Sequence, residues 1–446
     1  MVRKSVAIIG AGVSGLAAGK VLLEDGFDIT IFDRHKTLGG IWSPDWAYVH
    51  QHTQTIASLM EFSNLHDTEV ETASGDHETF EFDLIVVATG LFSTPEKPNF
   101  PGQNKFSGSI QHITDIKSED QLKNKRVIVI GGAKSAVDMA TLAAMHANYG
   151  FSRIFTHIFD PFPNAPHSAA FYFFHRVFSF VFTKITDSIA NFLISKYKSD
   201  LFADEKFIPK GSIRNAHNIM RLTKEFVTMI RENRIIRKLA SIDEIVDKTT
   251  IRLDSGELLQ ADLIICATGF IETLTKTLVR NTTRSTSDEG IDLDLYRQII
   301  PIGIPNIAFI GLPAPLHTWM FYEVQCHWMS DYFLSRIKLP NTEKEMLEEI
   351  ETTRQFIYKM FKRKSYYFQY YWLEPMEIYL RDMGLSLYRT NNWISEYFGV
   401  YRPKRLSTLH DERKAKAENK TINFWYFSFQ HTILLFLFLL FICFFF

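Results

Sequence analysis

The glycine pattern near the start of the chain restricts its fold more than any other feature. An apolar stretch from Val6 to Ile9 leads into three glycines spaced G-x-G-x-x-G, namely Gly10, Gly12 and Gly15. A second apolar stretch, from Ile29 to Phe32, ends at Asp33. Strand, glycine turn, helix, second strand and terminal acid together are typical of a βαβ dinucleotide-binding unit. The alternative is an ordinary buried turn, because G-x-G-x-x-G on its own is a weak signal.

Each residue of this pattern has a mechanical role in the expected site. We expect Gly10 to form the tight turn and Gly12 to let the backbone approach a pyrophosphate. Gly15 would allow the helix to pack closely on the strand, and the free N–H groups at the helix N-terminus would face the phosphate charge. Asp33 would accept a hydrogen bond from a ribose hydroxyl.

A second, altered copy of the pattern begins near residue 125. Val127 to Ile130 reads as a strand and Gly131 follows it, but Ala133 and Ala136 stand where the second and third glycines are expected. We expect the next strand near residues 154–159. A methyl group at Ala133 has to be accommodated if the backbone is to approach a phosphate. The loop is either a nucleotide site or a plain turn, and its position behind an intact first copy favours the nucleotide site.

Two matched strand ends accompany these copies. Residues 82–90 read FDLIVVATG and residues 261–269 read ADLIICATG, and such unbroken apolar runs are typical of fully buried parallel strands. Ligands lie at the carboxyl ends of strands in open α/β sheets, where Gly90 and Gly269 would let a cofactor come close. The sequence therefore predicts an α/β protein with one dinucleotide-binding fold inserted in another.

Composition excludes several classes of protein. The 446 residues carry a formal charge of −1 without a basic stripe, so we expect no nucleic-acid partner. The three cysteines, Cys266, Cys326 and Cys443, form no close pair, which argues against a disulfide framework and against a metal site. A basic start before an apolar run is typical of a secretory signal, but the glycine spacing argues against one. A reducing, cytosol-facing compartment fits this cysteine content.

Five motifs together resemble the class B flavin-containing monooxygenases. They are GGIW at 39–42, FSGSIQH at 106–112, GGAKSA at 131–136, CATGF at 266–270 and EVQCHW at 323–328. The resemblance covers most of residues 1–340, and its most specific part is the identifying sequence Phe106-x-Gly108-x-x-x-His112 between the two nucleotide domains. A structural role for His112 in the link between domains is favoured over proton transfer. Ile116 stands where relatives carry an aromatic residue.

The resemblance implies two Rossmann-like domains, with the NADP domain inserted in the FAD domain. We expect the FAD-binding domain at 1–108 and 261–340, the NAD(P)-binding domain at 109–260, a helical C-terminal region at 341–420 and a transmembrane helix at 424–446. The helical region has a clear amphipathic start at residues 343–364.

The resemblance also implies a reaction and its cofactors, FAD and NADPH. In this family the reduced flavin captures O2 as a C4a-hydroperoxide and passes one oxygen atom to a soft nitrogen or sulfur centre, while the protein orients the nicotinamide and excludes water. Small lipophilic amines or sulfides would be the substrates. The residues carried over to cofactor binding are Gly10, Gly12, Val13, Ser14, Gly15, Asp33, Gly40, Ile41, Trp42, Gln54, Thr55, Gly90, Gly131, Ser135, Ala136, Asp138 and Gly269.

Gln54 is the candidate catalytic residue. It lies in the sequence HTQT, where relatives place an asparagine or glutamine near the flavin and the nicotinamide ribose. A side-chain amide there can donate a hydrogen bond to the peroxide without acting as an acid. The alternative is that Gln54 is a polar turn residue.

Three departures from the family pattern change these expectations. Relatives carry a much longer segment between the motif Phe62-Ser63-Asn64 and the first ATG strand, so we expect the FAD domain to be shortened near 64–70 and peroxide release to compete with oxygen transfer. Ala133 replaces a glycine of the phosphate loop. Asp160 stands where relatives supply an arginine to the 2′-phosphate of NADP, which makes NADH a possible cofactor.

The end of the chain predicts attachment to a membrane. Residues 424–446 carry no charged side chain and follow a basic segment with Arg413, Lys414, Lys416 and Lys420. Since ~20 apolar residues cross a bilayer core, we expect a tail anchor in the endoplasmic reticulum membrane with the body facing the cytosol. A mis-spliced or read-through end is the alternative. The Phe-rich stretch 171–197 is interrupted by charges. It fits either a core or domain-interface helix, or a lid or membrane-facing helix that guides lipophilic substrates.

Three functions fit these observations. The first is a membrane-tethered, FAD- and NADPH-dependent monooxygenase of nitrogen or sulfur centres. The second is an uncoupled NAD(P)H oxidase or a non-catalytic flavin-binding protein, because of the missing segment. The third is a pyridine nucleotide disulfide reductase, which needs a close cysteine pair that this sequence does not have.

Overall fold

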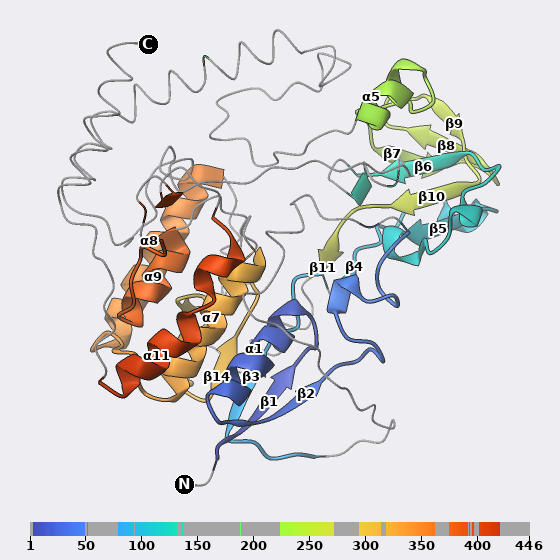
Figure 1. Ribbon diagram of the computed structural model, residues 1–446. Helices are drawn as coiled ribbons and strands as arrows, with labels where there is room; N and C mark the ends of the chain where they lie inside the picture. The colour runs from blue at the N-terminus through green and yellow to red at the C-terminus, as the bar shows by residue number, and fades with distance from the viewer. Residues whose placement is uncertain are drawn as a thin grey trace.

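In the computed structural model the chain forms two lobes, and two short paired strands run between them (Figure 1). The described residues are 3–49, 51, 79–92, 94–131, 135–136, 139, 188, 224–271, 294–313, 318–361, 374–390, 392, 395–396 and 401–419. The expected strand near 154–159, the Phe-rich stretch 171–197 except Ser188, the shortened region near 64–70 and the tail 424–446 lie outside them.

The first lobe is built on a parallel sheet with the strand order β14-β3-β1-β2. Its strands are β1 (Ser5–Ile9), β2 (Asp28–Phe32), β3 (Leu84–Val87) and β14 (Ile307–Phe309). All neighbours pair in parallel, which confirms the predicted strands at 6–9, 29–32 and 82–90. Because the strands are parallel, their carboxyl ends lie along one edge of the sheet, and the glycine loop begins at that edge.

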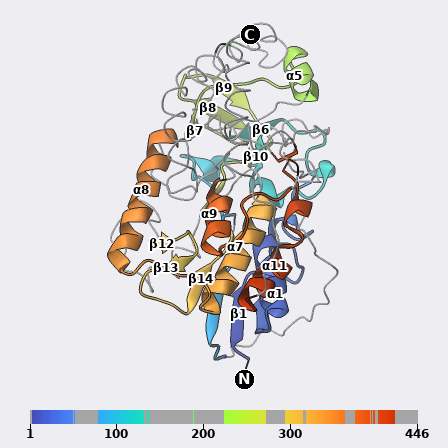
Figure 2. The same cartoon turned by 60° about the vertical axis from the view of Figure 1, so that its left-hand side comes forward.

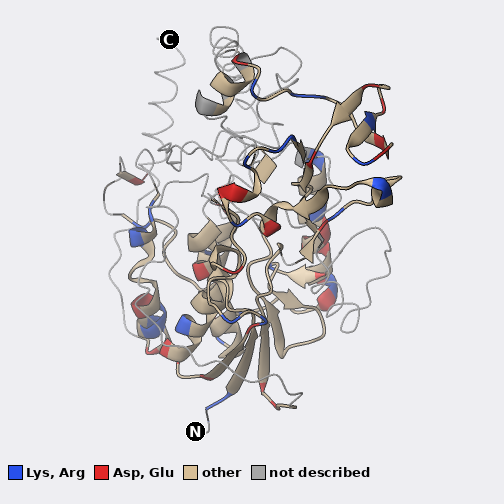
Figure 3. Cartoon of the chain, turned by 90° about the vertical axis from the view of Figure 1, so that its right-hand side faces the viewer, with Lys and Arg blue, Asp and Glu red and all other residues tan. Residues whose placement is uncertain are grey.

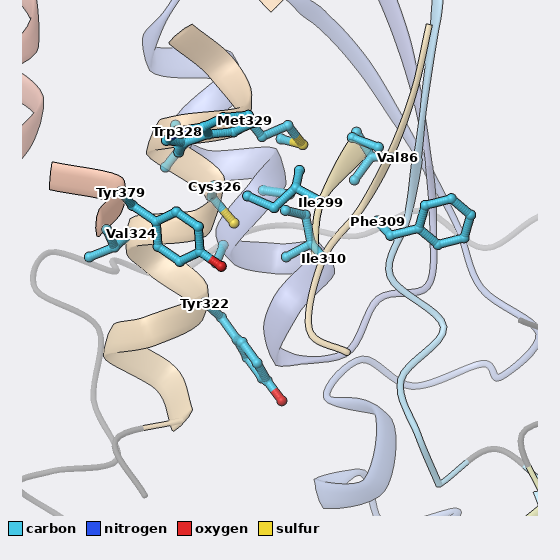
Figure 4. Close-up of a cluster of buried hydrophobic side chains, with 14 of the residues drawn as sticks. Val86, Ile299, Phe309, Ile310, Tyr322, Val324, Cys326, Trp328, Met329 and Tyr379 are labelled. Atoms are coloured by element: carbon cyan, nitrogen blue, oxygen red, sulfur yellow. The ribbon is translucent and has the colours of Figure 1, made fainter. Parts of the chain in front are cut away.

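Two helices pack against each other beside this sheet, α1 (Val13–Glu24) and α7 (Thr318–Phe333) (Figure 1). Nearly every residue of α7 from Met320 to Phe333 is buried, so this helix is enclosed on all sides rather than half exposed. Figure 4 shows the resulting core, in which Ile310 lies toward α7 while Phe309 points to the other side of the strand. This alternation is the period-2 pattern of a strand that is covered on both faces.

The helical C-terminal region covers the outer side of α7 (Figure 2). It contains α8 (Glu343–Phe361), α9 (Glu374–Asp382), the 3-10 helix η8 (Pro403–Leu406) and α11 (Leu409–Ala417). The expected helical character of 341–420, including the amphipathic start at 343, is confirmed for the described residues. A short antiparallel hairpin of β12 (Leu295–Tyr296) and β13 (Ile300–Pro301) lies between α8, which contacts β12, and β14, which contacts β13.

The second lobe contains a parallel sheet with the order β5-β10-β6. Its strands are β5 (Ser109–His112), β6 (Val127–Ile130), as predicted, and β10 (Leu263–Cys266). An antiparallel sheet of β7 (Ile242–Ile245), β8 (Thr250–Leu253) and β9 (Leu258–Gln260) lies beside it, with α5 (Lys224–Arg231). Since β10 pairs with β5 and β6, the expected domain boundary at residue 261 falls inside this lobe, and the chain leaves the lobe only after β10.

Two short strands lie between the lobes, β4 (Thr94–Pro95) and β11 (Phe270–Ile271), and they pair in antiparallel fashion (Figure 1). One strand enters the second lobe and the other returns from it, as expected for one domain inserted in another. Four short 3-10 helices complete the described elements, and these are η1 (Gly40–Trp42), η3 (Gln103–Lys105), η4 (Ile113–Asp115) and η5 (Glu119–Gln121).

Charged residues of both signs are dispersed over the described elements (Figure 3), which agrees with the net charge of −1. Within the described part of the chain, no helix combines the length and the apolar character needed to cross a bilayer.

Candidate functional site

The first glycine loop lies at the carboxyl edge of the first sheet, where β1 ends. Gly10 has a φ of +114°, and a Cβ atom there would lie 2.4 Å from the carbonyl oxygen of Ala88, which follows β3. A Cβ atom on Gly15 would lie 1.8 Å from the carbonyl oxygen of Gly10. Both positions therefore require glycine, and together they bring the start of α1 directly against the turn.

The N-terminus of α1 is open to a ligand. The helix begins after Gly12, no side chain caps it, and its first turn contains no acidic residue. Free N–H groups at such a terminus carry partial positive charge, which attracts phosphate. Asp33 stands beside this loop at the end of β2, where one carboxylate oxygen accepts from Ala11 N at 2.6 Å and the other from His35 N at 2.8 Å. Each oxygen keeps a lone pair that can accept from a ribose hydroxyl.

The GGIW segment packs onto this loop. Gly39 N donates to Ala11 O at 2.9 Å, and a Cβ atom on Gly40, whose φ is +58°, would lie 3.1 Å from Gly12 Cα. Residues 40–42 form the 3-10 helix η1, and Gln51 Nε2 donates to Ile41 O at 3.1 Å. The structure thus brings Gly40, Ile41 and Trp42 next to the glycine loop, as the resemblance implies.

Three features of this edge fit a bound dinucleotide. Ser43 is 1% exposed, and its hydroxyl has no hydrogen-bond partner in the described part of the chain. A buried hydroxyl without a partner is costly, so it points to a polar group that the described residues do not supply. Gly90 has a φ of +68°, and among the described residues a Cβ atom there would meet nothing within 4 Å beside the strand end. Together with the uncapped start of α1, these residues fit FAD.

The end of β14 also reaches this loop, which the sequence patterns do not indicate. Gly311 has a φ of +83°, and a Cβ atom there would lie 2.1 Å from the Ser14 hydroxyl. Ser14 is in the first turn of α1, so the segment after β14 lies directly against the cofactor loop. The only sequence signal for this contact is the glycine that follows the apolar strand Ile307–Phe309.

The second glycine loop repeats the first at its opening residue. Gly131 has a φ of +140°, and a Cβ atom there would lie 2.4 Å from the carbonyl oxygen of Ala267. Ser135 and Ala136 are helical and lie close to the end of β6, and Gly269, with a φ of +91°, has open space beside it. Residues 132–134 and Asp138 lie outside the described residues, so the phosphate-binding part of this loop stays a prediction.

His112 lies where the two lobes join. Its buried ring places Nε2 3.0 Å from Gly269 O and Nδ1 2.9 Å from Thr114 Oγ1, and it packs on Phe270 with ring centroids 5.0 Å apart. Burial lowers the pKa of His112, so the ring is neutral and donates through Nε2 to the carbonyl. These contacts fit the expected linking role. The glycine of the same motif is also required, because a Cβ atom on Gly108 would lie 2.3 Å from Asp262 O.

Gln54 and Thr55, expected near the flavin, lie outside the described residues. Among the described residues, no group of three or more histidine, cysteine or acidic side chains could hold a metal ion. Cys266 and Cys326 are both buried free thiols, and burial raises the pKa of each. A buried thiol with a raised pKa is a poor nucleophile, which argues against the disulfide reductase alternative.

Comparison with known proteins points to one family. The model of the family "Flavin-binding monooxygenase-like" matches residues 45–384, and that of the NAD(P)-binding Rossmann-like domain matches residues 8–54. Flavin-containing monooxygenase 1 of Sus scrofa is 25% identical over 427 aligned positions, which include 79% of this chain and 77% of the relative. Flavin-containing monooxygenase 5 of Homo sapiens is 24% identical over 433 positions, with 81% and 79% covered.

Solved structures show the same fold. An open structure of cyclohexanone monooxygenase matches with a TM-score of 0.58 at 18% identity, covering 86% of this chain and 98% of that one. The S-allyl-L-cysteine S-oxygenase of Allium sativum matches with a TM-score of 0.53 at 18% identity, covering 94% of each chain. Because the family model spans most of the sequence and the curated relatives align over about four fifths of it, this chain belongs to the flavin-binding monooxygenase-like family and is an FAD- and NADPH-dependent monooxygenase.

Proposed function

We propose that this monooxygenase oxygenates soft nitrogen or sulfur centres of small lipophilic amines or sulfides. The observation that carries the proposal is the glycine loop at 10–15, with Asp33, Gly40 and the Ser43 hydroxyl around it. The match of the sequence to the flavin-binding monooxygenase-like family supports the same function. The comparisons give no support to the oxidase or non-catalytic alternative.

The roles of individual residues follow from this geometry. The uncapped start of α1 and the approach allowed by Gly12 would hold the FAD pyrophosphate, and Asp33 would accept from the ribose. Residues 40–42 and Gly90 would line the flavin side, together with Gln54 and Thr55. Gly131, Ser135, Ala136, Asp138 and Gly269 would lie along the NADPH. FAD supplies hydride acceptance from NADPH and activation of O2, and the protein orients both cofactors and excludes water.

A test of the proposal uses the purified full chain and one substitution. We expect the wild type to keep flavin absorbance after gel filtration and to convert a tertiary amine or S-allyl-L-cysteine, the substrate named for the Allium sativum enzyme, to its oxide with NADPH. Asp33→Ala should lose FAD, whereas Asp28→Ala, which removes an exposed carboxylate from the start of the same strand, should keep it. NADPH oxidation without any oxide would contradict the proposal.

We also propose that the FAD domain is shortened near residues 64–70. The alignment with the pig enzyme has 427 positions but includes only 79% of the 446 residues, or about 352, which leaves about 75 positions without a residue of this chain. Loss of a pocket wall admits water, so a share of the NADPH should be spent on hydrogen peroxide. Measuring peroxide and oxide per NADPH on one preparation tests this, and oxide formation equal to NADPH consumption would contradict it.

Asp160 is proposed to weaken the preference for NADPH, although it lies outside the described residues. A carboxylate repels a 2′-phosphate but accepts from the 2′-hydroxyl of NADH. We expect Asp160→Arg to shift the ratio of kcat/KM for flavin reduction toward NADPH by roughly 10-fold, since one charge contact is worth about 1–2 kcal/mol. An unchanged ratio in the variant would exclude this role.

Residues 424–446 are proposed to anchor the protein in the endoplasmic reticulum membrane with its body in the cytosol. The supporting observation is the uncharged apolar sequence after Lys414, Lys416 and Lys420. The full-length chain should pellet with membranes and resist carbonate extraction, and deletion of 424–446 should release it. Full-length protein in the soluble fraction would contradict the anchor.

A further inference from the structure

The segment that follows β14 carries no recognised motif, but it packs directly against the start of α1, next to the first glycine loop. Gly311, directly after β14 and Ile310, has its backbone against Ser14, since a Cβ atom there would lie 2.1 Å from Ser14 Oγ and 2.7 Å from Ser14 Cβ. Ser14 belongs to the first turn of α1, whose N–H groups face the proposed phosphate position. Any shift of Gly311 is therefore transmitted to the loop that holds the cofactor.

One face of α7 holds this contact in place. Tyr322, Gln325 and Cys326 are three and four residues apart, so they lie on the same side of the helix. The Tyr322 hydroxyl donates to Pro313 O at 2.8 Å, and Cys326 Sγ lies 3.9 Å from Ser14 O. Figure 4 shows Tyr322 and Cys326 projecting from α7 on the side of the strand that carries Ile310. From the same face of α7, Gln325 Oε1 accepts from Gly311 N at 3.4 Å.

Gln325 connects this contact to the helical C-terminal region. Its side chain is fully buried, and Nε2 donates to the Tyr379 hydroxyl of α9 at 3.2 Å. That hydroxyl donates in turn to Arg297 O at 2.8 Å, in the turn between β12 and β13. A buried amide is costly unless its groups are paired, and an apolar side chain of this size would fill a core position without that cost. The bonds themselves are therefore the reason for an amide here.

We propose that Gln325 is a positioning residue for FAD: its amide links Gly311 to Tyr379 and fixes the backbone that presses on Ser14. The proposal rests on the proposed binding of FAD by loop 10–15. It assigns to α9 and the β12–β13 turn an influence on the flavin that passes through Gln325 and Gly311 to Ser14.

The test measures the release of FAD from the holoprotein, followed by the rise in flavin fluorescence on dilution, together with the visible absorption spectrum of the bound flavin. Gln325→Leu keeps the volume and removes both bonds, so we expect FAD release to accelerate roughly 10-fold. Tyr379→Phe removes only the outer hydroxyl and should accelerate it roughly 3-fold. Ser330→Ala is the matched control, because it removes a partly buried hydrogen bond from α7 to Asp25 and leaves Gly311 and Ser14 unchanged.

The outcomes separate this proposal from the proposed function. If the wild type holds no FAD, the proposed site fails before the variants are compared. If FAD release and the flavin spectrum of Gln325→Leu match the wild type while its melting temperature falls like that of Ser330→Ala, Gln325 serves stability alone and the proposal is wrong. If Gln325→Leu does not fold, Tyr379→Phe decides, and an unchanged release rate in that variant overturns the link.

Discussion

The two dinucleotide loops open in the same way but differ in how closely the following helix can approach. A Cβ atom on Gly10 or on Gly131 would lie 2.4 Å from the carbonyl oxygen of the alanine after the neighbouring strand, so both turns require glycine. In the first loop, Gly15 also has no room for a methyl group. In the second loop the corresponding position already carries the buried methyl group of Ala136.

This difference shows which part of the pattern is dictated by the sheet and which by helix packing. The first glycine depends on the carbonyl of a neighbouring strand, which both lobes supply. The third glycine depends on the distance between helix and turn, and α1 is held close because α7 packs along it. In the second lobe, Ala136 belongs to a buried cluster with Ile113 and Leu263. The substitutions below test this comparison from the largest expected effect to the smallest.

Exchange of glycine and alanine at these two positions should have consequences of different size. Gly15→Ala places a Cβ atom into the Gly10 carbonyl, so we expect a loss of about 3–5 kcal/mol of unfolding free energy and of bound FAD. Ala136→Gly removes one buried methyl group from a helix and should cost about 1–2 kcal/mol with FAD retained. Thermal unfolding measures the stability of each variant, and flavin absorbance after gel filtration measures its bound FAD. Equal losses in the two variants would show that the loops are packed alike.

The stability of the first lobe should also depend more on its ion pairs than the stability of the second lobe does. Arg413 of α11 has a side chain that is 1% exposed, and its guanidinium bonds Asp25 at 2.7 Å, Asp331 at 2.8 Å and His327 Nδ1 at 2.8 Å. Arg413→Met removes the guanidinium that Asp25 and Asp331 share and leaves Asp331 with only the partly exposed Arg336 at 3.2 Å, so we expect a loss of about 3–5 kcal/mol.

The matched control lies in the second lobe, where Arg126 pairs with Asp262 at 2.6 Å but is 52% exposed. Water screens that pair, so Arg126→Met should leave the unfolding transition nearly unchanged. Urea unfolding of both variants distinguishes the cases. If Arg126→Met lost as much unfolding free energy as Arg413→Met, the buried ion pairs of Arg413 would not stabilise the first lobe more than an exposed pair stabilises the second.

Local sequence patterns predicted the elements that depend on neighbouring residues. They missed the contacts between residues that lie far apart in the sequence. The strands at 6–9, 29–32 and 127–130, the parallel sheets and the amphipathic helix from 343 follow from short apolar periods and glycine spacing, and the structure confirms them. The contact of Gly311 with Ser14 and the cluster around Arg413 join residues hundreds of positions apart, and no local period marks such contacts. The placement of β10 in the second sheet was missed for the same reason, because its apolar run fits either lobe.

Acidity should loosen the junction between the lobes. Burial lowers the pKa of His112 below its ordinary value of 6.5, so the unfolded chain binds a proton at this site more readily than the folded chain. Stability is therefore complete above about pH 6.5 and falls as the pH decreases below it, by at most about 1.4 kcal/mol per pH unit for one histidine. His327 in the first lobe, whose pKa burial and Arg413 also lower, adds a loss of the same sign.

His112→Gln separates the two histidines, because its amide can donate to Gly269 O but does not titrate. The variant should lose less unfolding free energy than the wild type between pH 7.5 and pH 5.5, and the remaining loss should fall further when His327 is also replaced. A pH dependence identical to that of the wild type would show that His112 is as easily protonated in the folded chain as in the unfolded one. The His112 ring would then be as accessible to water as a histidine on the surface, and its packing on Phe270 would not exclude water from it.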